Sequence, residues 1–154
     1  MPALRYTVAL HVDRALARKV PRRRLTSLAR RTLAAHEVAT PAELSIVVTD
    51  DDTLRELNRR YRGKDAPADV LSFGPDAGDG FVTPPDSPRQ LGEVLISYPM
   101  AQQQAEESGR SIAEELEHLL VHGNLHLLGF DHQGAAERRV MRAREEALLG
   151  RPAH

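Results

Sequence analysis

Residues 113–132 read AEELEHLLVHGNLHLLGFDH and carry the strongest structural signal in the chain. Ser111 stands just before this stretch and Glu114 follows three residues later, which is the pattern of a capping box at a helix start. Gly129 is placed to end the helix with a left-handed turn. The stretch therefore predicts a helix that runs to about Leu128 and closes with a glycine turn.

Strands and helices alternate irregularly in the rest of the chain. Alternating or short apolar runs predict strands over residues 5–12, 44–49, 69–73 and 91–97. Further helices are predicted over residues 21–38, 99–108 and 137–149, with a short one after an Asp51 or Asp52 cap. Residues 61–68 and 74–90 read as loops. Two of the strands are adjacent in sequence, which favours an α+β domain with a small mixed sheet.

The composition fits one globular domain. The chain has 154 residues, of which 41% are hydrophobic and 28% charged, and it shows neither a repeat nor a linker. We therefore expect a single domain over residues 1–154. The absence of cysteine excludes disulfides and cysteine-bound metals. No apolar run approaches the roughly 20 residues of a membrane span, and no signal peptide is evident, so a cytoplasmic location is expected.

The charge pattern limits how the chain could bind nucleic acid. The formal net charge is -1, so there is no global attraction and any contact must come from a local patch. Aromatic residues make up only 4%, which disfavours a base-stacking platform. The run Arg22 to Arg24, with Arg30 and Arg31, reads equally well as an RNA-facing patch or as a solvated helix face.

Four of the seven histidines fall between His118 and His132. His118, His122 and His126 recur every four residues, and neighbours at that spacing lie about 5–6 Å apart on a helix. His118 and His126 would be about 12 Å apart along the axis, too far to share one metal ion. A single metal must therefore take one adjacent pair and a further ligand from elsewhere.

Gly129 indicates which pair that is. A turn there brings His132 back toward the helix end, to which His122 and His126 are nearer. The resulting H-x3-H-x5-H set leaves a fourth position open for water, which is typical of a catalytic zinc site with one Zn²⁺ per chain. His118 is then expected to pack in the interior or support a ligand. Asp131 could orient a ligand or cap the next helix.

The spacing is shared with a class of zinc peptidases that carry a glutamate after the first histidine as general base. Gly123 occupies that position here. A peptidase-like hydrolase therefore remains only as an alternative function.

The segment HGNLHLLGFDH (His122–His132) resembles the signature of the YbeY family of bacterial endoribonucleases. The likeness extends to LNRRYRGKDAPADVLSF (Leu57–Phe73), which is similar to the arginine-bearing loop and following strand of that family. LGEVLIS (Leu91–Ser97) and AEELEHLLVHG (Ala113–Gly123) resemble its next strand and its central helix. These blocks cover about half the chain and follow the order of the family.

The resemblance implies a metal-dependent endoribonuclease that cleaves single-stranded RNA. It implies a role in late 3′ maturation of small-subunit ribosomal RNA and in ribosome quality control, with ribosomal RNA and the small subunit as partners and no membrane or DNA. It maps the metal ligands onto His122, His126 and His132, and an important arginine onto Arg62.

The resemblance also implies a four-stranded mixed sheet surrounded by helices. Lys64 would add attraction for phosphate. The family often has threonine where this chain has Ala68, so a hydroxyl is missing there, and the loop from Gly74 to Gln90 matches no part of the family pattern. A non-catalytic ribosome assembly factor with structural zinc is a further alternative, but structural sites usually fill all four positions.

Overall fold

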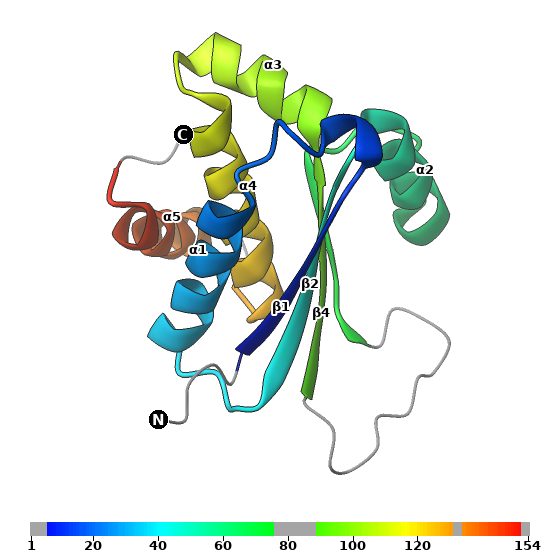
Figure 1. The fold of residues 1–154 in the computed structure, drawn as a ribbon. Coiled ribbons are helices and arrows are strands. Elements are labelled where there is room, and N and C mark those ends of the chain that lie inside the picture. Colours follow the sequence, from blue (N-terminus) through cyan, green and yellow to red (C-terminus); the bar gives the residue numbers. More distant parts are fainter. Residues whose placement is uncertain (1–5, 76–88, 131–133, 152–154) are drawn as a thin grey trace.

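A four-stranded mixed sheet forms the centre of the computed structural model, which describes residues 6–75, 89–130 and 134–151 (Figure 1). Its strands are β1 (Tyr6–Val12), β2 (Ala42–Thr49), β3 (Val70–Phe73) and β4 (Arg89–Ser97), in the order β1-β2-β4-β3. β2 is parallel to both β1 and β4, whereas β3 is antiparallel to β4. The predicted α+β class with a small mixed sheet is therefore confirmed.

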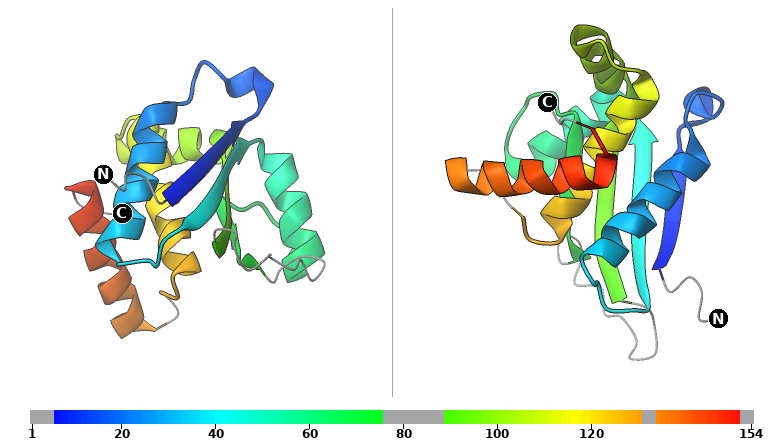
Figure 2. Two further views of the ribbon diagram at one scale, coloured as in Figure 1. Left: turned by 60° about the horizontal axis from the view of Figure 1, so that its bottom comes forward. Right: turned by 90° about the vertical axis from the view of Figure 1, so that its left-hand side faces the viewer.

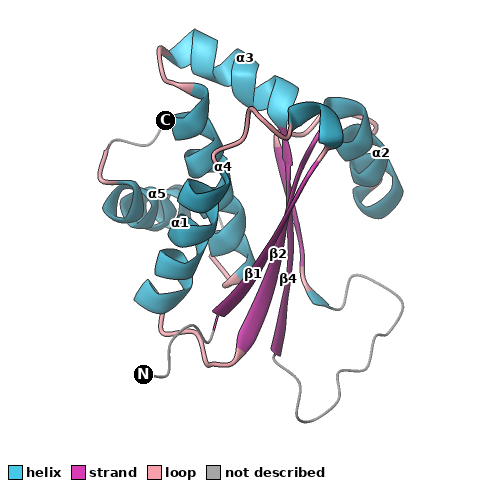
Figure 3. Cartoon of the chain, viewed as in Figure 1, coloured by secondary structure: helices cyan, strands magenta, loops and turns pink. Residues whose placement is uncertain are grey.

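Five α-helices and one short 3-10 helix are described around the sheet. They are η1 (Arg14–Leu16), α1 (Arg22–Ala35), α2 (Asp51–Arg62), α3 (Tyr98–Ser108), α4 (Ile112–Leu127) and α5 (Ala135–Leu149). Helices α1 and α4 lie on one side of the sheet and α2 lies on the other (Figure 3). Helix α4 contacts α1, α3, α5, β3 and β4, so it is the central helix of the fold.

Successive side chains of β4 belong to two different hydrophobic clusters, one on each face of the sheet. Val94 and Ile96 join the main core beneath α1 and α4, whereas Leu95 packs with Leu54 and Leu71 beneath α2. Successive side chains of a strand point to opposite faces, so both faces of β4 are buried. This burial explains why the strand reads as an almost continuous apolar run.

Local capping explains most of the helix boundaries. The capping box of Ser111 and Glu114 at the start of α4 is confirmed by both of its hydrogen bonds. The predicted cap of α2 at Asp51 or Asp52 is wrong, because the side chain of Asp50 accepts the Thr53 N–H at 2.7 Å. Asp50 keeps an extended backbone after β2, and the other two acids occupy the first helical turn.

Several further boundaries differ from the prediction; β4, for example, begins at Arg89, inside the expected loop 74–90. Helix α1 ends at Ala35 rather than near Val38, because Glu37 adopts a left-handed backbone with φ 52°. Helix α2 continues through Tyr61 and Arg62, which were expected in a loop, and ends at Gly63 with φ 70°. Arg62 therefore projects from the last turn of a helix. Among the described residues, no helix combines the length and apolar character needed to cross a membrane.

Candidate metal centre

Gly123 brings α4 unusually close to the sheet. A Cβ atom added at this glycine would lie 2.6 Å from Val94 Cγ1 and 3.1 Å from Val70 Cγ2. The Ser72 hydroxyl donates a hydrogen bond to the Gly123 carbonyl at 2.9 Å, which ties the helix to β3. There is no room here for the glutamate that would act as base in a zinc peptidase, so the structure also disfavours that alternative.

His122 and His126 lie next to each other on α4, as their spacing predicts. Their ring centroids are 5.0 Å apart and their planes are inclined by 71°. Both rings line one cleft of about 690 Å³. Two neighbouring imidazoles on the wall of a cleft are a suitable partial ligand set for zinc, which prefers nitrogen and sulfur donors.

The predicted third ligand, His132, lies outside the described residues, as does Asp131. Within the described part of the chain, no group of three or more histidine or acidic side chains is placed to hold a metal ion. Gly129 has φ 99°, which confirms the left-handed turn expected at the end of α4.

Arg62 and Lys64 line the same cleft as the two histidines. They flank Gly63, whose left-handed backbone turns the chain away from α2. The Asn58 side chain then donates to the Ala66 carbonyl at 3.0 Å and fixes the segment that follows. The end of α2 and the segment after it thus place Arg62 and Lys64 on the cleft that the two histidines line, although the cations and the histidines are far apart in sequence.

Arg62 differs from Arg55 and Arg59 of the same helix in its ionic contacts. Arg55 and Arg59 form ion pairs with Asp65 and Glu56, respectively. Arg62 has no ion pair with any residue that the structure describes. Its charge is therefore available to an anion in the cleft.

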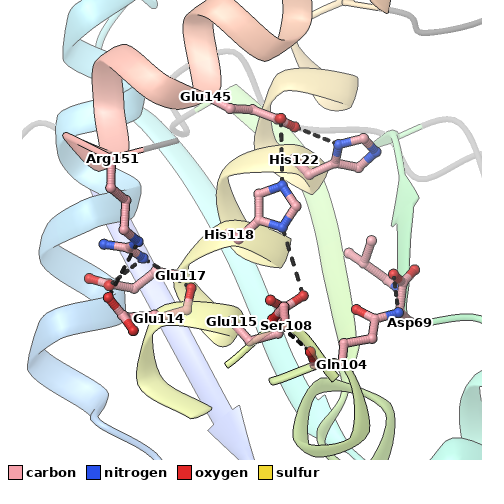
Figure 4. Close-up of polar contacts among 11 residues, drawn as sticks. Asp69, Gln104, Ser108, Glu114, Glu115, Glu117, His118, His122, Glu145 and Arg151 are labelled. Carbon is pink, nitrogen blue, oxygen red and sulfur yellow. Dashed lines mark hydrogen bonds and ion pairs between the residues drawn. The ribbon is translucent and has the colours of Figure 1, made fainter. Parts of the chain in front are cut away.

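Glu145 of α5 is a site residue that sequence reasoning missed. The His122 Nδ1 atom lies 2.6 Å from Glu145 Oε2, within hydrogen-bond distance (Figure 4). The sequence signal was weak, because Glu145 reads as one more charge in a highly charged helix. It does stand four residues after Met141, and these two are the buried residues of α5. A glutamate on the buried side of a helix is unusual unless it is paired.

His118 is packed in the interior, in line with one of its two expected roles. Only 6% of this residue is exposed, and its ring lies between two carboxylates. Glu145 Oε1 is 3.5 Å from His118 Nε2, and Glu115 Oε2 is 3.8 Å from Nδ1. Those separations are long for hydrogen bonds, and both contacts are ion pairs when His118 is protonated. Together with His122, these side chains form a row of alternating acids and bases.

The charges in this row stabilise one another. Burial disfavours the imidazolium of His118, but the carboxylates of Glu115 and Glu145 outweigh it and raise the pKa of His118 to about 9. Burial likewise disfavours ionised Glu145, but His118 and His122 outweigh it and lower the pKa of Glu145 to about 2. At neutral pH Glu145 is therefore an anion that accepts hydrogen bonds.

A second cavity of about 510 Å³ adjoins the first cleft, and His122 and Asp69 line both. His118 and Glu145 lie on the wall of this second cavity. His122 therefore both contacts Glu145 and lines the cleft that contains Arg62.

Three of the five arginines in the run on α1 make hydrogen bonds within the fold. Arg22 donates to the Leu10 carbonyl, Arg30 to the Tyr6 carbonyl, and Arg24 makes two hydrogen bonds to Glu117. None of the run lines either cavity. These contacts favour a structural role for the run over an RNA-facing patch.

Comparison with known proteins gives a consistent result. The family model described as "Endoribonuclease YbeY" matches residues 11–152. A protein of that name from Roseiflexus castenholzii is 53% identical over 120 residues, covering 77% of this chain and 76% of the relative. One from Chloroflexus aggregans is 48% identical over 146 residues, which is 94% of each chain.

A solved structure also resembles the fold. The solution structure of a Thermotoga maritima protein aligns with a TM-score of 0.50 at 21% identity. The alignment covers 94% of this chain and 89% of that one. At this identity the likeness supports the fold alone.

Proposed function

Because this chain belongs to the YbeY family of endoribonucleases, we propose that it is a zinc-dependent enzyme that cleaves single-stranded RNA. We further propose that it acts late in 3′ maturation of small-subunit ribosomal RNA and in ribosome quality control. The observation that carries the chemical part of the proposal is the cleft that His122 and His126 share with Arg62 and Lys64.

The donor chemistry of the cleft suits zinc. Neutral imidazole nitrogens are common zinc ligands, and because His122 Nδ1 lies 2.6 Å from Glu145, the ring would bind the ion through Nε2. His122 and His126 would hold the ion together with His132. Bound zinc would polarise a phosphoryl oxygen or activate a water molecule.

Arg62 is suited to the charge that develops on a phosphodiester. Its planar guanidinium can donate two parallel hydrogen bonds to non-bridging oxygens. As the phosphorus centre becomes five-coordinate, negative charge grows on those oxygens and the hydrogen bonds strengthen. Since Arg62 has no carboxylate partner in the described chain, forming these bonds breaks no existing ion pair. Lys64 adds a second positive charge that attracts the RNA backbone.

Cleavage of a defined oligonucleotide tests the enzymatic proposal. We expect the zinc-loaded protein to cut a single-stranded RNA faster than a duplex of the same sequence, and His126→Ala to abolish cutting. Chelation should stop the reaction and zinc should restore it. A zinc-loaded, folded protein that cuts no single-stranded RNA would contradict the proposal and favour the assembly-factor alternative.

The ribosomal role needs a cellular measurement. Cells that lack the protein should accumulate small-subunit ribosomal RNA with an unprocessed 3′ end, and the wild-type gene should restore processing. Correctly matured 3′ ends in such cells would contradict this part of the proposal and leave the chemical part standing.

A further inference from the structure

We propose that Glu145 is a positioning residue of the metal site, which holds the His122 ring so that its Nε2 atom is directed at the metal. The inference rests on the metal site proposed above. The carboxylate belongs to α5 and the histidine to α4, so the contact joins two helices that are separate in sequence. Figure 2 shows α5 crossing α4, which is how the two side chains meet.

The hydrogen bond determines the tautomer of His122. A carboxylate has no proton to donate, so the proton in the 2.6 Å contact must reside on His122 Nδ1. A neutral ring with its proton on Nδ1 has its lone pair on Nε2. In Figure 4 that second nitrogen points away from Glu145. The same hydrogen bond thus selects the tautomer that can ligate zinc and fixes the orientation of the ring.

Glu145 is itself held in place. It is only 4% exposed, and its second oxygen is 3.5 Å from the buried His118. Glu115, which is fully buried, lies on the far side of His118. A carboxylate fixed on both oxygens has little rotational freedom, so little conformational entropy remains to be lost when the metal binds. His118 therefore supports the metal site through Glu145.

The expected effect follows from how such pairs behave in metalloproteins. A carboxylate that accepts from the outer nitrogen of a ligating histidine raises the basicity of the metal-facing nitrogen. Removing such a partner typically weakens metal affinity by about 10- to 100-fold. Glu145→Gln keeps the shape of the side chain but removes the negative charge, so it should weaken zinc binding within this range.

Glu117 provides a matched control. It is a glutamate of similar burial, 6% exposed, and it pairs with Arg24 and Arg151 rather than with a histidine. Glu117→Gln therefore also removes a buried, paired charge, and it should lower thermal stability. Because it does not contact His122, it should leave the zinc dissociation constant unchanged.

The test is zinc affinity measured by competition with a chromophoric chelator for the wild type, Glu145→Gln and Glu117→Gln. We expect affinity to fall about 10- to 100-fold in Glu145→Gln alone, and RNA cleavage by that variant to recover at saturating zinc. Equal affinities in all three proteins, or equal losses in both variants, would overturn the inference. A wild type that binds no zinc would instead contradict the proposed function, and the inference with it.

A second measurement needs no variant and so does not depend on whether Glu145→Gln folds. Nitrogen-15 NMR of the metal-free wild-type protein reports which ring nitrogen of each histidine is protonated. We expect His122 to be protonated on Nδ1, with zinc shifting the Nε2 resonance. A His122 ring that carries its proton on Nε2 would overturn the inference.

Discussion

Gly123 illustrates how one residue can exclude one chemistry and permit another. It follows His122 directly, where a zinc peptidase has its catalytic glutamate. The structure gives a packing reason for the glycine, because Val94, Val70 and Ser72 leave no space for a Cβ. The same close approach brings His122 near the edge of β3, beside the cleft.

We predict that Gly123→Ala destabilises the protein by about 1–3 kcal/mol, because overpacking forces the helix away from the sheet. At an open helical position the same change would stabilise by about 0.5–1 kcal/mol, so the sign of the effect is diagnostic. Urea denaturation of the metal-free protein measures it. Unchanged or increased stability would show that α4 does not approach the sheet this closely.

Substitution of Arg62 tests whether the protein is an enzyme or a non-catalytic assembly factor. Arg62→Ala should keep the fold and the zinc but lose about 1.5–3 kcal/mol of charge-assisted hydrogen bonding, which is about one to two powers of ten in rate. Arg62→Lys should recover only part of the rate, because an ammonium cannot form the two-pronged contact. RNA binding should fall less than turnover, since the contact strengthens in the transition state.

Single-turnover cleavage with a separate binding assay measures both quantities for Arg62. Arg60→Ala is a suitable control, because this arginine lies over the Tyr61 ring and does not line the cleft. If Arg62→Ala cuts at the wild-type rate, Arg62 is not catalytic.

Gly129 allows the predicted turn toward His132 to be tested directly. Nothing lies within 4 Å of a Cβ atom added at this glycine, so a side chain there would strain the backbone without causing a steric clash. A left-handed backbone costs L-residues about 1–2 kcal/mol, and more for a β-branched residue. Gly129→Val should therefore weaken zinc binding by about tenfold or more.

The control for this change is Gly109→Val. Gly109 has φ 71° and equally open surroundings, but it ends α3, which carries none of the proposed ligands. It should lose stability and keep its zinc affinity. Full zinc affinity in Gly129→Val would contradict the proposed role of the turn.

At the scale of single elements, α2 matters because its last turn carries Arg62. The helix begins where the Asp50 carboxylate accepts the Thr53 N–H. The Thr53 side chain and this N–H together lower the pKa of the Asp50 carboxyl. A carboxylate at a helix start is also favoured by the helix dipole. The cap therefore contributes to the stability of the helix that carries Arg62.

Asp50→Ala should cost about 1 kcal/mol, whereas Asp50→Asn should cost less because asparagine is also a good cap. Since the folded pKa lies below the unfolded one, the contribution of Asp50 is complete above the unfolded pKa. It is lost as the pH falls through the folded value, so the difference between wild type and Asp50→Ala should shrink in acid. A difference in the free energy of unfolding that grows in acid would contradict this cap.

At the scale of the whole molecule, α4 joins the sheet, three helices and the proposed metal site. Arg151, beyond the end of α5, donates to Glu117, which also accepts from Arg24 of α1. These contacts bind α1 and α5 to the middle of α4, just as Glu145 does nearer the cleft. A ligand held by α4 should therefore stabilise the fold as a unit.

We predict that zinc raises the melting temperature of the protein. A ligand that binds only the folded state adds about 2.7 kcal/mol at 100 times its dissociation constant, or several degrees for a domain of this size. The shift should disappear in His126→Ala and persist in Glu117→Gln. An identical shift in His126→Ala would place the zinc elsewhere. Differential scanning calorimetry with and without chelator makes the measurement.

The sequence by itself determined the features that depend on near neighbours. The capping box at Ser111, the left-handed turn at Gly129 and the strand runs are governed by hydrogen bonds and side-chain periodicity within a few residues. The pairing of His122 with His126 is equally local, because a helix places every fourth residue on one face. These features, and the α+β class they predict, agree with the structure.

Only the tertiary structure decided which distant side chains surround the histidines. The contact of Glu145 with His122 depends on α5 crossing α4, and the position of Arg62 on the cleft depends on α2 continuing to the residue before Gly63. Neither the crossing of two helices nor the packing of α2 on β3 and β4 is encoded by any short window of residues. Both follow from how the whole hydrophobic core is shared among the elements, which is why a buried glutamate on α5 could read as a surface charge.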